Sequence, residues 1–216
     1  RRQGNITEQA RLREIELDAV SACAVAVVVS EEEKTMLQEE VAKAGREAVR
    51  VHVIANAHEP QPRTRTVFNK RRGLVFVGNF NHLPNRDAVL YFANEVLPRL
   101  LSSSKVRNDP GFVFHVVGAN ALPPSILALN GSTLGSGPHE RVRVHGYVPQ
   151  LRPLFSHMRL SVAPLRWGAG VKGKVNSAHQ LGVPVVCTSI AISGMHATHD
   201  QDVLVADTPE EMAAAV

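Results

Sequence analysis

The chain has 216 residues, of which 44% are hydrophobic, 20% are charged and 5% are aromatic. This composition is typical of a folded globular protein, and the scarcity of aromatic residues argues against a base-stacking surface for single-stranded nucleic acid. The net charge of +4 at pH 7 suits an anionic small ligand as well as nucleic acid, so charge alone leaves both open. No apolar run approaches 18 residues, which excludes a transmembrane helix from this sequence.

The N-terminal quarter predicts two helices and two strands. Apolar residues at helical spacing predict a helix over residues 6–22, and the apolar run 24–29 predicts a strand buried on both faces. Ser30, with Glu33 three residues later, forms a capping box that opens a helix over residues 31–44. A second strand follows over residues 49–54. Because two strands are too few to close a sheet, we interpret residues 1–57 as the C-terminal end of an α/β domain.

Residues 58–72 break this pattern, since they combine prolines and basic residues with little apolar content. We interpret the segment as an interdomain linker. The alternative, an arm that binds nucleic acid, would need a longer basic run.

From Gly73 onward, strands and helices alternate regularly. Strands are predicted over residues 74–77, 112–117, 142–145, 160–163, 185–188 and 203–206, with helices over 85–101, 124–129, 150–157 and 174–182. Strands that alternate with helices at this spacing predict an α/β fold with a doubly wound parallel sheet over residues 73–216.

Ligands bind outside the carboxyl ends of the strands in such a sheet, so the loops after the strands indicate the site. The first three strands of this domain are followed by Gly78-Asn79-Phe80, by Gly118 and by Gly146-Tyr147-Val148. Glycine allows a ligand to approach the backbone, although strand–helix turns also use it for positive φ. The set as a whole indicates a binding site.

The fourth loop and the helix after it read PLRWGAGVKGKVNSAH and contain Arg166, Gly168, Gly170, Lys172 and Lys174. Glycines, a helix N-terminus and several cations together favour an anion such as a phosphate. Arg166 and Lys172 suit a diphosphate, because one is a planar fork and the other a point charge.

Other kinds of site are less well supported. The sequence has no P-loop, and no Gly-x-Gly-x-x-Gly follows the first strand of the sheet. The ten histidines form no zinc signature. His115 and His145 each interrupt a strand, and we interpret them as buried imidazoles with hydrogen-bond partners or as residues that line the cleft.

Five segments occur in the order seen in the C-terminal domain of group 1 (family 4) glycosyltransferases: LVFVGNFNHLPNRDAVLYFANEVLPRL, FVFHVVGAN, RVRVHGYVPQLRPLFSHMRLSVAPLRWGAGVKGKV, LGVPVVCTSIAISGM and DVLVADTPEEMAAAV. The chain resembles this family over about residues 73–216, and residues 11–56 resemble the last two strands of its N-terminal, acceptor-binding domain. The resemblance implies a GT-B fold, in which two Rossmann-like domains face each other across a cleft. It also implies a hexosyltransferase-like, retaining enzyme that moves a sugar from a nucleotide-sugar donor to an acceptor.

The resemblance assigns roles to the loop residues. Arg166 and Lys172 would hold the donor diphosphate and offset the charge on the leaving nucleotide. Tyr147 and Val148 would lie against the base, and residues 78–80 would face the phosphates and the acceptor side. The other expected substrate-binding residues are Gly118, Gly146, Gly168, Gly170, Lys174 and Ser177. No metal and no separate cofactor are implied, because the nucleotide sugar is itself a substrate.

Ser177 departs from the family pattern, which commonly has a glutamate there that accepts hydrogen bonds from the donor ribose. Ala169, eight residues earlier, stands where a second glutamate is often found. A serine still bonds a hydroxyl, but without charge assistance, a difference of about 1–2 kcal/mol. The alternative function is therefore a degenerate, non-catalytic member that binds a nucleotide or a partner. An epimerase or phosphorylase of the same fold would need cleft carboxylates that the sequence does not place.

The expected partners are a nucleotide sugar and an acceptor, which is a glycan, a lipid or a small molecule, with no nucleic acid. The chain begins with Arg1 rather than Met and ends within a helical pattern, so we expect a piece of a longer protein that lacks most of the N-terminal domain. The expected location is the cytoplasm or the cytoplasmic face of a membrane.

Overall fold

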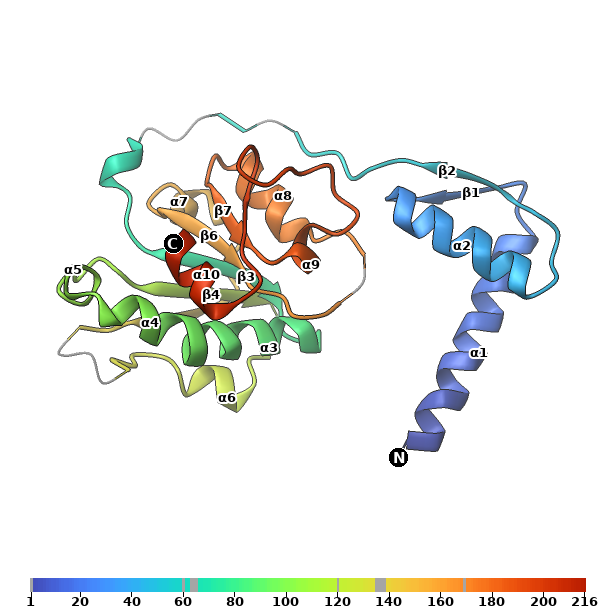
Figure 1. The fold of residues 1–216 in the computed structure, drawn as a ribbon. Coiled ribbons are helices and arrows are strands. Elements are labelled where there is room, and N and C mark those ends of the chain that lie inside the picture. Colours follow the sequence, from blue (N-terminus) through green and yellow to red (C-terminus); the bar gives the residue numbers. More distant parts are fainter. Residues whose placement is uncertain (1, 60, 63–65, 120, 135–138, 169) are drawn as a thin grey trace. The chain divides into compact units, whose positions relative to one another are not determined.

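A computed structural model describes residues 2–59, 61–62, 66–119, 121–134, 139–168 and 170–216. The chain forms two compact units, Arg1–Ala57 and His58–Val216, and both contain helices and parallel strands (Figure 1). Among the residues described, no helix has the length and apolar character needed to cross a membrane.

The first unit is built from α1 (Arg2–Ser21), β1 (Val25–Val28), α2 (Glu31–Lys43) and β2 (Arg50–Val53). The two strands pair in parallel, with Val25 opposite Arg50. Ser30 caps α2 as predicted, since its hydroxyl accepts the N–H of Glu33 at 3.1 Å. The Glu33 carboxylate accepts the N–H of Val29 at 3.1 Å, so the reciprocal bond of the box comes from the residue before the cap.

The prediction that the strand over residues 24–29 is buried on both faces is wrong. Val25 and Val27 are 41% and 58% exposed. In the described part of this unit, the buried apolar side chains are Leu17, Val41 and Val51. These three side chains cannot cover both faces of the two-stranded sheet. The apolar run therefore reflects strand propensity, while burial depends on how many elements surround the strand.

The second unit contains a six-stranded parallel sheet in the order β5-β4-β3-β6-β7-β8. Its strands are β3 (Leu74–Asn79), β4 (Phe114–Ala119), β5 (Val142–Gly146), β6 (Leu160–Ala163), β7 (Val185–Cys187) and β8 (Leu204–Val205). The strand order reverses between β3 and β6, which is the doubly wound, Rossmann-like arrangement that the alternation predicted. The predicted strands agree with these positions to within two residues.

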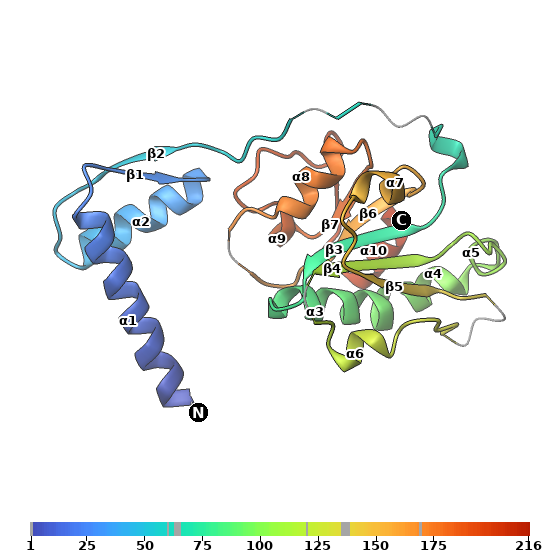
Figure 2. The same cartoon turned by 180° about the vertical axis from the view of Figure 1, so that it is seen from behind.

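Helices cover both faces of this sheet, with α3, α4 and α6 on one side and α7 and α8 on the other (Figures 1 and 2). The helices are α3 (Leu83–Tyr91), α4 (Leu97–Ser102), α5 (Ser104–Arg107), α6 (Pro124–Leu127), α7 (Leu151–Phe155), α8 (Gly173–Gln180), α9 (Ser189–Ile192) and α10 (Pro209–Ala215), with a 3-10 turn η1 (Phe68–Lys70). The helix predicted over residues 85–101 is continuous but widens into a π-helical segment, η2 (Phe92–Val96), just before Pro98. Proline lacks an N–H and its ring collides with the carbonyl four residues earlier, which the wider turn relieves.

The core of the second unit lies between the sheet and these helices. The rings of Phe92 and Phe114 pack with their centroids 4.6 Å apart, and both side chains are fully buried. α10 packs against α4 and η2, and its capping box is formed by Thr208 and Glu211. This packing fixes the strands, and so fixes the loops at their carboxyl ends.

Candidate functional site

A cleft of about 420 Å³ lies at the carboxyl ends of the strands, where the strand order reverses. Several predicted substrate-binding residues line it: Gly78, Asn79, Gly118, Tyr147, Val148, Lys174 and Ser177. Four loops or helices far apart in the sequence supply these residues, and the parallel sheet brings them to one edge. The position is the one at which doubly wound sheets bind ligands.

The glycines near the carboxyl ends of β3 and β4 are required by packing beneath the cleft. A Cβ at Gly78 would lie 2.8 Å from Cε1 of Phe76 and 2.9 Å from Cγ of Asn85. A Cβ at Gly118 would overlap the ring of Phe80, which is fully buried. Glycine is required at position 146 for a different reason. The φ of Gly146 is +67°, which lies in the left-handed region that residues with side chains rarely adopt.

The loop between β3 and α3 is held by asparagines. Asn85 donates from Nδ2 to the carbonyl of Asn79 at 2.8 Å, and Oδ1 of Asn79 accepts the N–H of Asn81 at 2.9 Å. Asn85 lines the cleft although the sequence did not indicate it, since an asparagine near a helix start has no distinctive spacing. The side chain of Phe80 points into the core, so this residue can face a ligand only through its main chain.

Lys174 brings a cation into the cleft from the second residue of α8. Its ammonium lies 5.5 Å from the centroid of the Phe76 ring. No carboxylate or carbonyl of the described residues forms an ion pair or hydrogen bond with it. Burial, followed by the nearby charge of Lys172, lowers the pKa of Lys174 to about 8. A desolvated ammonium at a helix N-terminus attracts an anion strongly.

Ser177 follows Lys174 by three residues on α8, so the two side chains share one face of the helix. Both line the cleft. The cleft therefore presents a cation and a neutral hydroxyl on this face of α8.

Arg166 is paired with the protein rather than open to the cleft. Its Nε donates to Oδ2 of Asp87 at 2.9 Å and its Nη2 donates to Oδ1, so the pair is bidentate. The guanidinium centre also lies 4.9 Å from the centroid of the Tyr91 ring. The hydrogen bond from Arg166 lowers the pKa of Asp87. These contacts tie the loop after β6 to α3.

Lys172 is also bonded within the loop. It is 8% exposed, and its Nζ donates to the carbonyls of Gly168, at 3.1 Å, and Gly170. Gly168 and Gly170 have φ values of +128° and +75°, so both need the freedom of glycine. Ala169 lies outside the described residues. Lys172, Gly168 and Gly170 border the cleft-forming helix α8 without lining the cleft.

His115 and His145 form a pair away from the cleft. Nδ1 of His115 lies 2.8 Å from Nε2 of His145, and the rings stack with centroids 5.1 Å apart. Burial lowers the pKa of His115 to about 4 and also lowers the pKa of His145, so one neutral ring donates to the other. This confirms the interpretation of a buried, partnered imidazole for His115, whereas His145 has the expected partner but is exposed, so its predicted burial is wrong. Throughout the described part of the chain, no three metal-binding side chains gather.

The fold is a Rossmann-like domain, and a cleft that contains the ammonium of Lys174 lies at its topological switch point. The sequence pattern described as "Glycosyl transferases group 1" matches residues 71–216. The chain therefore belongs to the group 1 glycosyltransferases. A comparison with curated proteins gave no sequence match.

Solved structures of similar fold include three glycosyltransferase structures. TarM of S. aureus, in complex with UDP, fondaparinux and α-GlcNAc-glycerol, has a TM-score of 0.68 and 15% identity, over 92% of this chain and 37% of that chain. The pneumococcal O-GlcNAc transferase GtfA, in complex with UDP and GlcNAc, has a TM-score of 0.67 and 10% identity, over 93% of this chain and 39% of that chain. HepE of Anabaena, in complex with UDP and glucose, has a TM-score of 0.61 and 14% identity, over 94% of this chain and 55% of that chain. At these identities the likeness shows a shared GT-B fold, and the chain spans between 37% and 55% of those structures.

Proposed function

We propose that this chain carries the donor site of a retaining glycosyltransferase, which moves a sugar from a nucleotide sugar to a glycan, lipid or small-molecule acceptor. The observation that carries the proposal is Lys174, an ammonium in a cleft at the switch point with no anionic partner among the described residues. TarM, GtfA and HepE, which share the fold, are complexes with UDP, and this supports a nucleotide-sugar donor.

In the proposed complex the base lies against Tyr147 and Val148. Tyr147 is 70% exposed beside the cleft, so its ring can stack on a base with little rearrangement. The ribose hydroxyls face Ser177, and the diphosphate faces Lys174 and the N-terminus of α8. Gly78, Asn79 and Gly118 also line the cleft, and in the proposed complex their main chain faces the phosphates.

Arg166 and Lys172 are proposed to move onto the diphosphate when it binds. Arg166 would exchange the half-buried carboxylate of Asp87 for phosphate oxygens, and charged hydrogen bonds of the same kind to the phosphate would offset the loss of this bidentate pair. Lys172 would exchange loop carbonyls for the same charged acceptors, which form stronger hydrogen bonds. Together with Lys174 they would stabilise the departing nucleotide without a metal ion.

The proposed reaction breaks the bond between the anomeric carbon and the diphosphate oxygen. A bond from the acceptor hydroxyl to the same face of that carbon replaces it, and the hydroxyl proton leaves with the nucleoside diphosphate.

The alternative is a non-catalytic member that binds a nucleotide or a partner, and the neutral Ser177 favours it. The two differ in whether a bound nucleotide sugar is consumed.

Calorimetric titration with UDP tests the site. We expect saturable binding to the wild-type chain and at least a tenfold loss in Lys174→Met, because a charge-assisted bond is removed. Lys70→Met, which removes an exposed lysine from η1, should leave the affinity unchanged. Ser177→Glu should increase the loss of affinity from UDP to 2′-deoxy-UDP, because a carboxylate at this position would accept charge-assisted hydrogen bonds from the ribose. Absence of saturable binding in the wild type would overturn the proposal, and binding without consumption of UDP-glucose or UDP-GlcNAc by the longest available form would favour the non-catalytic alternative.

A further inference from the structure

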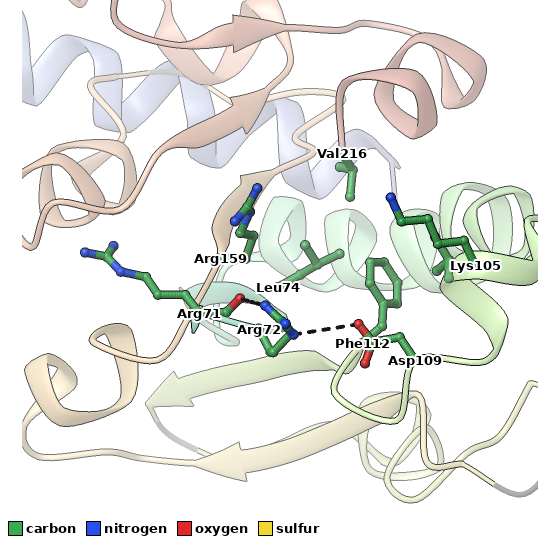
Figure 3. A pocket seen from close by; sticks show the side chains of 10 residues that line it. Arg71, Arg72, Leu74, Lys105, Asp109, Phe112, Arg159 and Val216 are labelled. Carbon is green, nitrogen blue, oxygen red and sulfur yellow. Dashed lines mark hydrogen bonds and ion pairs between the residues drawn. The ribbon is translucent and has the colours of Figure 1, made fainter. Parts of the chain in front are cut away.

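A second cleft, of about 400 Å³, lies at the opposite end of the same sheet, where β3 begins (Figure 3). Leu74, the first residue of β3, lies in its floor, whereas Gly78 and Asn79 at the other end of β3 line the first cleft. β3 is six residues long, so its two ends lie about 15–20 Å apart. No described residue lines both clefts, so the second is a separate site.

The second cleft carries an excess of positive charge. Its side chains include four cations, Arg71, Arg72, Lys105 and Arg159, and one carboxylate, Asp109, and Val216, the last residue of the sequence, also lines it (Figure 3). Asp109 is 3.9 Å from Arg72 and offsets part of that charge. Arg71 is 8% exposed and bonds the carbonyls of Thr66 and Gly182, so it belongs to the scaffold.

Lys105 and Arg159 hold the charges that can act on a ligand. Lys105 forms no hydrogen bond or ion pair with any residue that the structure describes, and Figure 3 shows it across the cleft from Arg159. Arg159 stacks its guanidinium 3.9 Å from the centroid of Phe68 and donates once to the Phe68 carbonyl. The stacking fixes the plane of the guanidinium while most of its five donors remain for other acceptors.

The floor between these cations is apolar. Leu74 is 1% exposed, and Val106 and Phe112 pack against the core beside it. A bare inorganic anion would leave this apolar floor in water, and a neutral apolar molecule would leave the cations unpaired. The ligand that satisfies both has an apolar body and a multiply charged anionic group, and the volume is that of a small-molecule site.

We propose that this second cleft binds an organic phosphate monoester with an apolar body. The phosphate lies between Lys105 and Arg159, which meet it as a point charge and as a planar fork, and the apolar body covers Leu74 and Phe112. A dianionic phosphate matches the excess of cations better than a carboxylate does. The source is a soluble phosphate ester or an acidic lipid with a phosphate monoester headgroup.

Phenyl phosphate is the probe for the soluble form. In a nitrogen-15 NMR titration, the amides of Gly73, Val106 and Phe112 should shift and saturate, and those of Gly118 and Ser177 report separately on the first cleft. Inorganic phosphate and phenol, each with half of the chemistry, should bind at least about fivefold more weakly than phenyl phosphate. Flotation with phosphatidylcholine vesicles that contain dioleoyl phosphatidate tests the lipid source.

Lys105→Gln should weaken phenyl phosphate binding about tenfold, because it removes one charged hydrogen bond. Arg107→Gln is the matched control, since it removes one positive charge from the same short helix, α5, at a residue outside the cleft lining. Equal losses in the two variants would show a general charge effect and overturn the proposal. So would the absence of saturable shifts at these amides together with no flotation. The Lys174→Met variant, which should lose UDP binding, should still bind phenyl phosphate as the wild type does. The proposals for the two clefts can therefore fail independently.

Discussion

Lys174→Met should stabilise the folded chain while it removes nucleotide binding. Burial and the charge of Lys172 lower the pKa of Lys174 from the ordinary 10.5 to about 8. One pKa unit corresponds to about 1.4 kcal/mol, so holding the ammonium charged at pH 7 costs the folded state about 3 kcal/mol. The contact with the Phe76 ring returns about 1–2 kcal/mol of this. We therefore expect the variant to gain about 1–2 kcal/mol in unfolding free energy.

Urea denaturation at several pH values measures this gain. Between about pH 8 and pH 10.5 the unfolded chain binds the Lys174 proton and the folded chain releases it, so wild-type stability should rise with pH across this window. The methionine variant lacks this term, and its advantage should shrink to near zero by pH 10.5. A variant that is less stable than the wild type at pH 7, by an amount independent of pH, would refute the reasoning.

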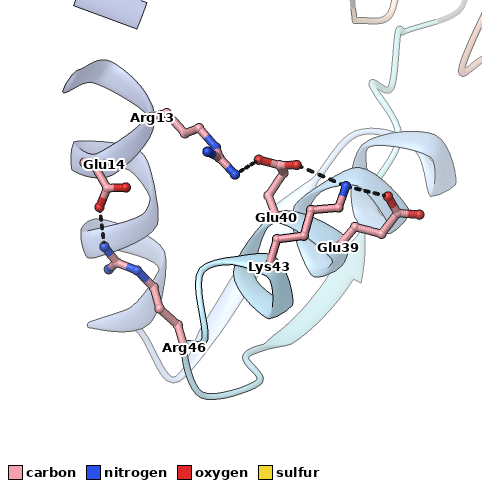
Figure 4. A network of polar contacts seen from close by, with 6 residues as sticks. All are labelled: Arg13, Glu14, Glu39, Glu40, Lys43 and Arg46. Carbon is pink, nitrogen blue, oxygen red and sulfur yellow. Dashed lines mark hydrogen bonds and ion pairs between the residues drawn. The ribbon is translucent and has the colours of Figure 1, made fainter. Parts of the chain in front are cut away.

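Three further substitutions test other contacts. Asp87→Asn should lower the free energy of unfolding by at most about 1 kcal/mol. It should also raise UDP affinity severalfold in calorimetry, because Arg166 would no longer have to break an ion pair before it binds the phosphates. A weaker affinity would mean that the pair with Asp87 positions Arg166 for binding. Arg141 is fully buried and donates to three carbonyls, so Arg141→Met should cost about 3–5 kcal/mol in urea denaturation, and a loss below 1 kcal/mol would contradict this. Arg46→Ala removes the ion pairs with Glu14 at 2.9 Å (Figure 4) and with Asp18 at 2.6 Å, and it should lower stability at low salt and less at 1 M salt. A loss unaffected by salt would point to packing instead.

The sheet was predictable because local signals and general rules determine it. Apolar runs gave the strands to within two residues, and the right-handed crossover rule leads from alternating elements to a parallel sheet. The four-residue helices α5 and α9 were missed, because so short a segment has no visible period. The exposure of β1 was missed for another reason, since burial depends on neighbours that a strand's own sequence does not contain.

The first cleft was predictable in its loops but not in its contacts. Gly78 and Gly118 lie at the carboxyl ends of strands and Lys174 lies in the first turn of a helix, so chain position alone brings them to one edge. The pairing of Arg166 with Asp87 joins residues 79 positions apart, and neither carries a local sign of the other. The second cleft was invisible for the same reason, because Leu74, Lys105 and Arg159 belong to three ordinary segments that meet only in the folded chain.

The serine at position 177 changes the electrostatics of the first cleft as well as its hydrogen bonding. A glutamate three residues after Lys174 on the same helix face would form an ion pair with it, raise the pKa of the ammonium and neutralise its charge. With Ser177, the ammonium has no carboxylate partner among the described residues, and its pKa is instead lowered to about 8. The cleft thus lacks a charged acceptor for the ribose, but it presents one more net positive charge to a diphosphate. A nucleotide that binds here should therefore depend more on its phosphates than on its ribose, so affinity should fall steeply from UDP to UMP and only slightly from UDP to its 2′-deoxy form.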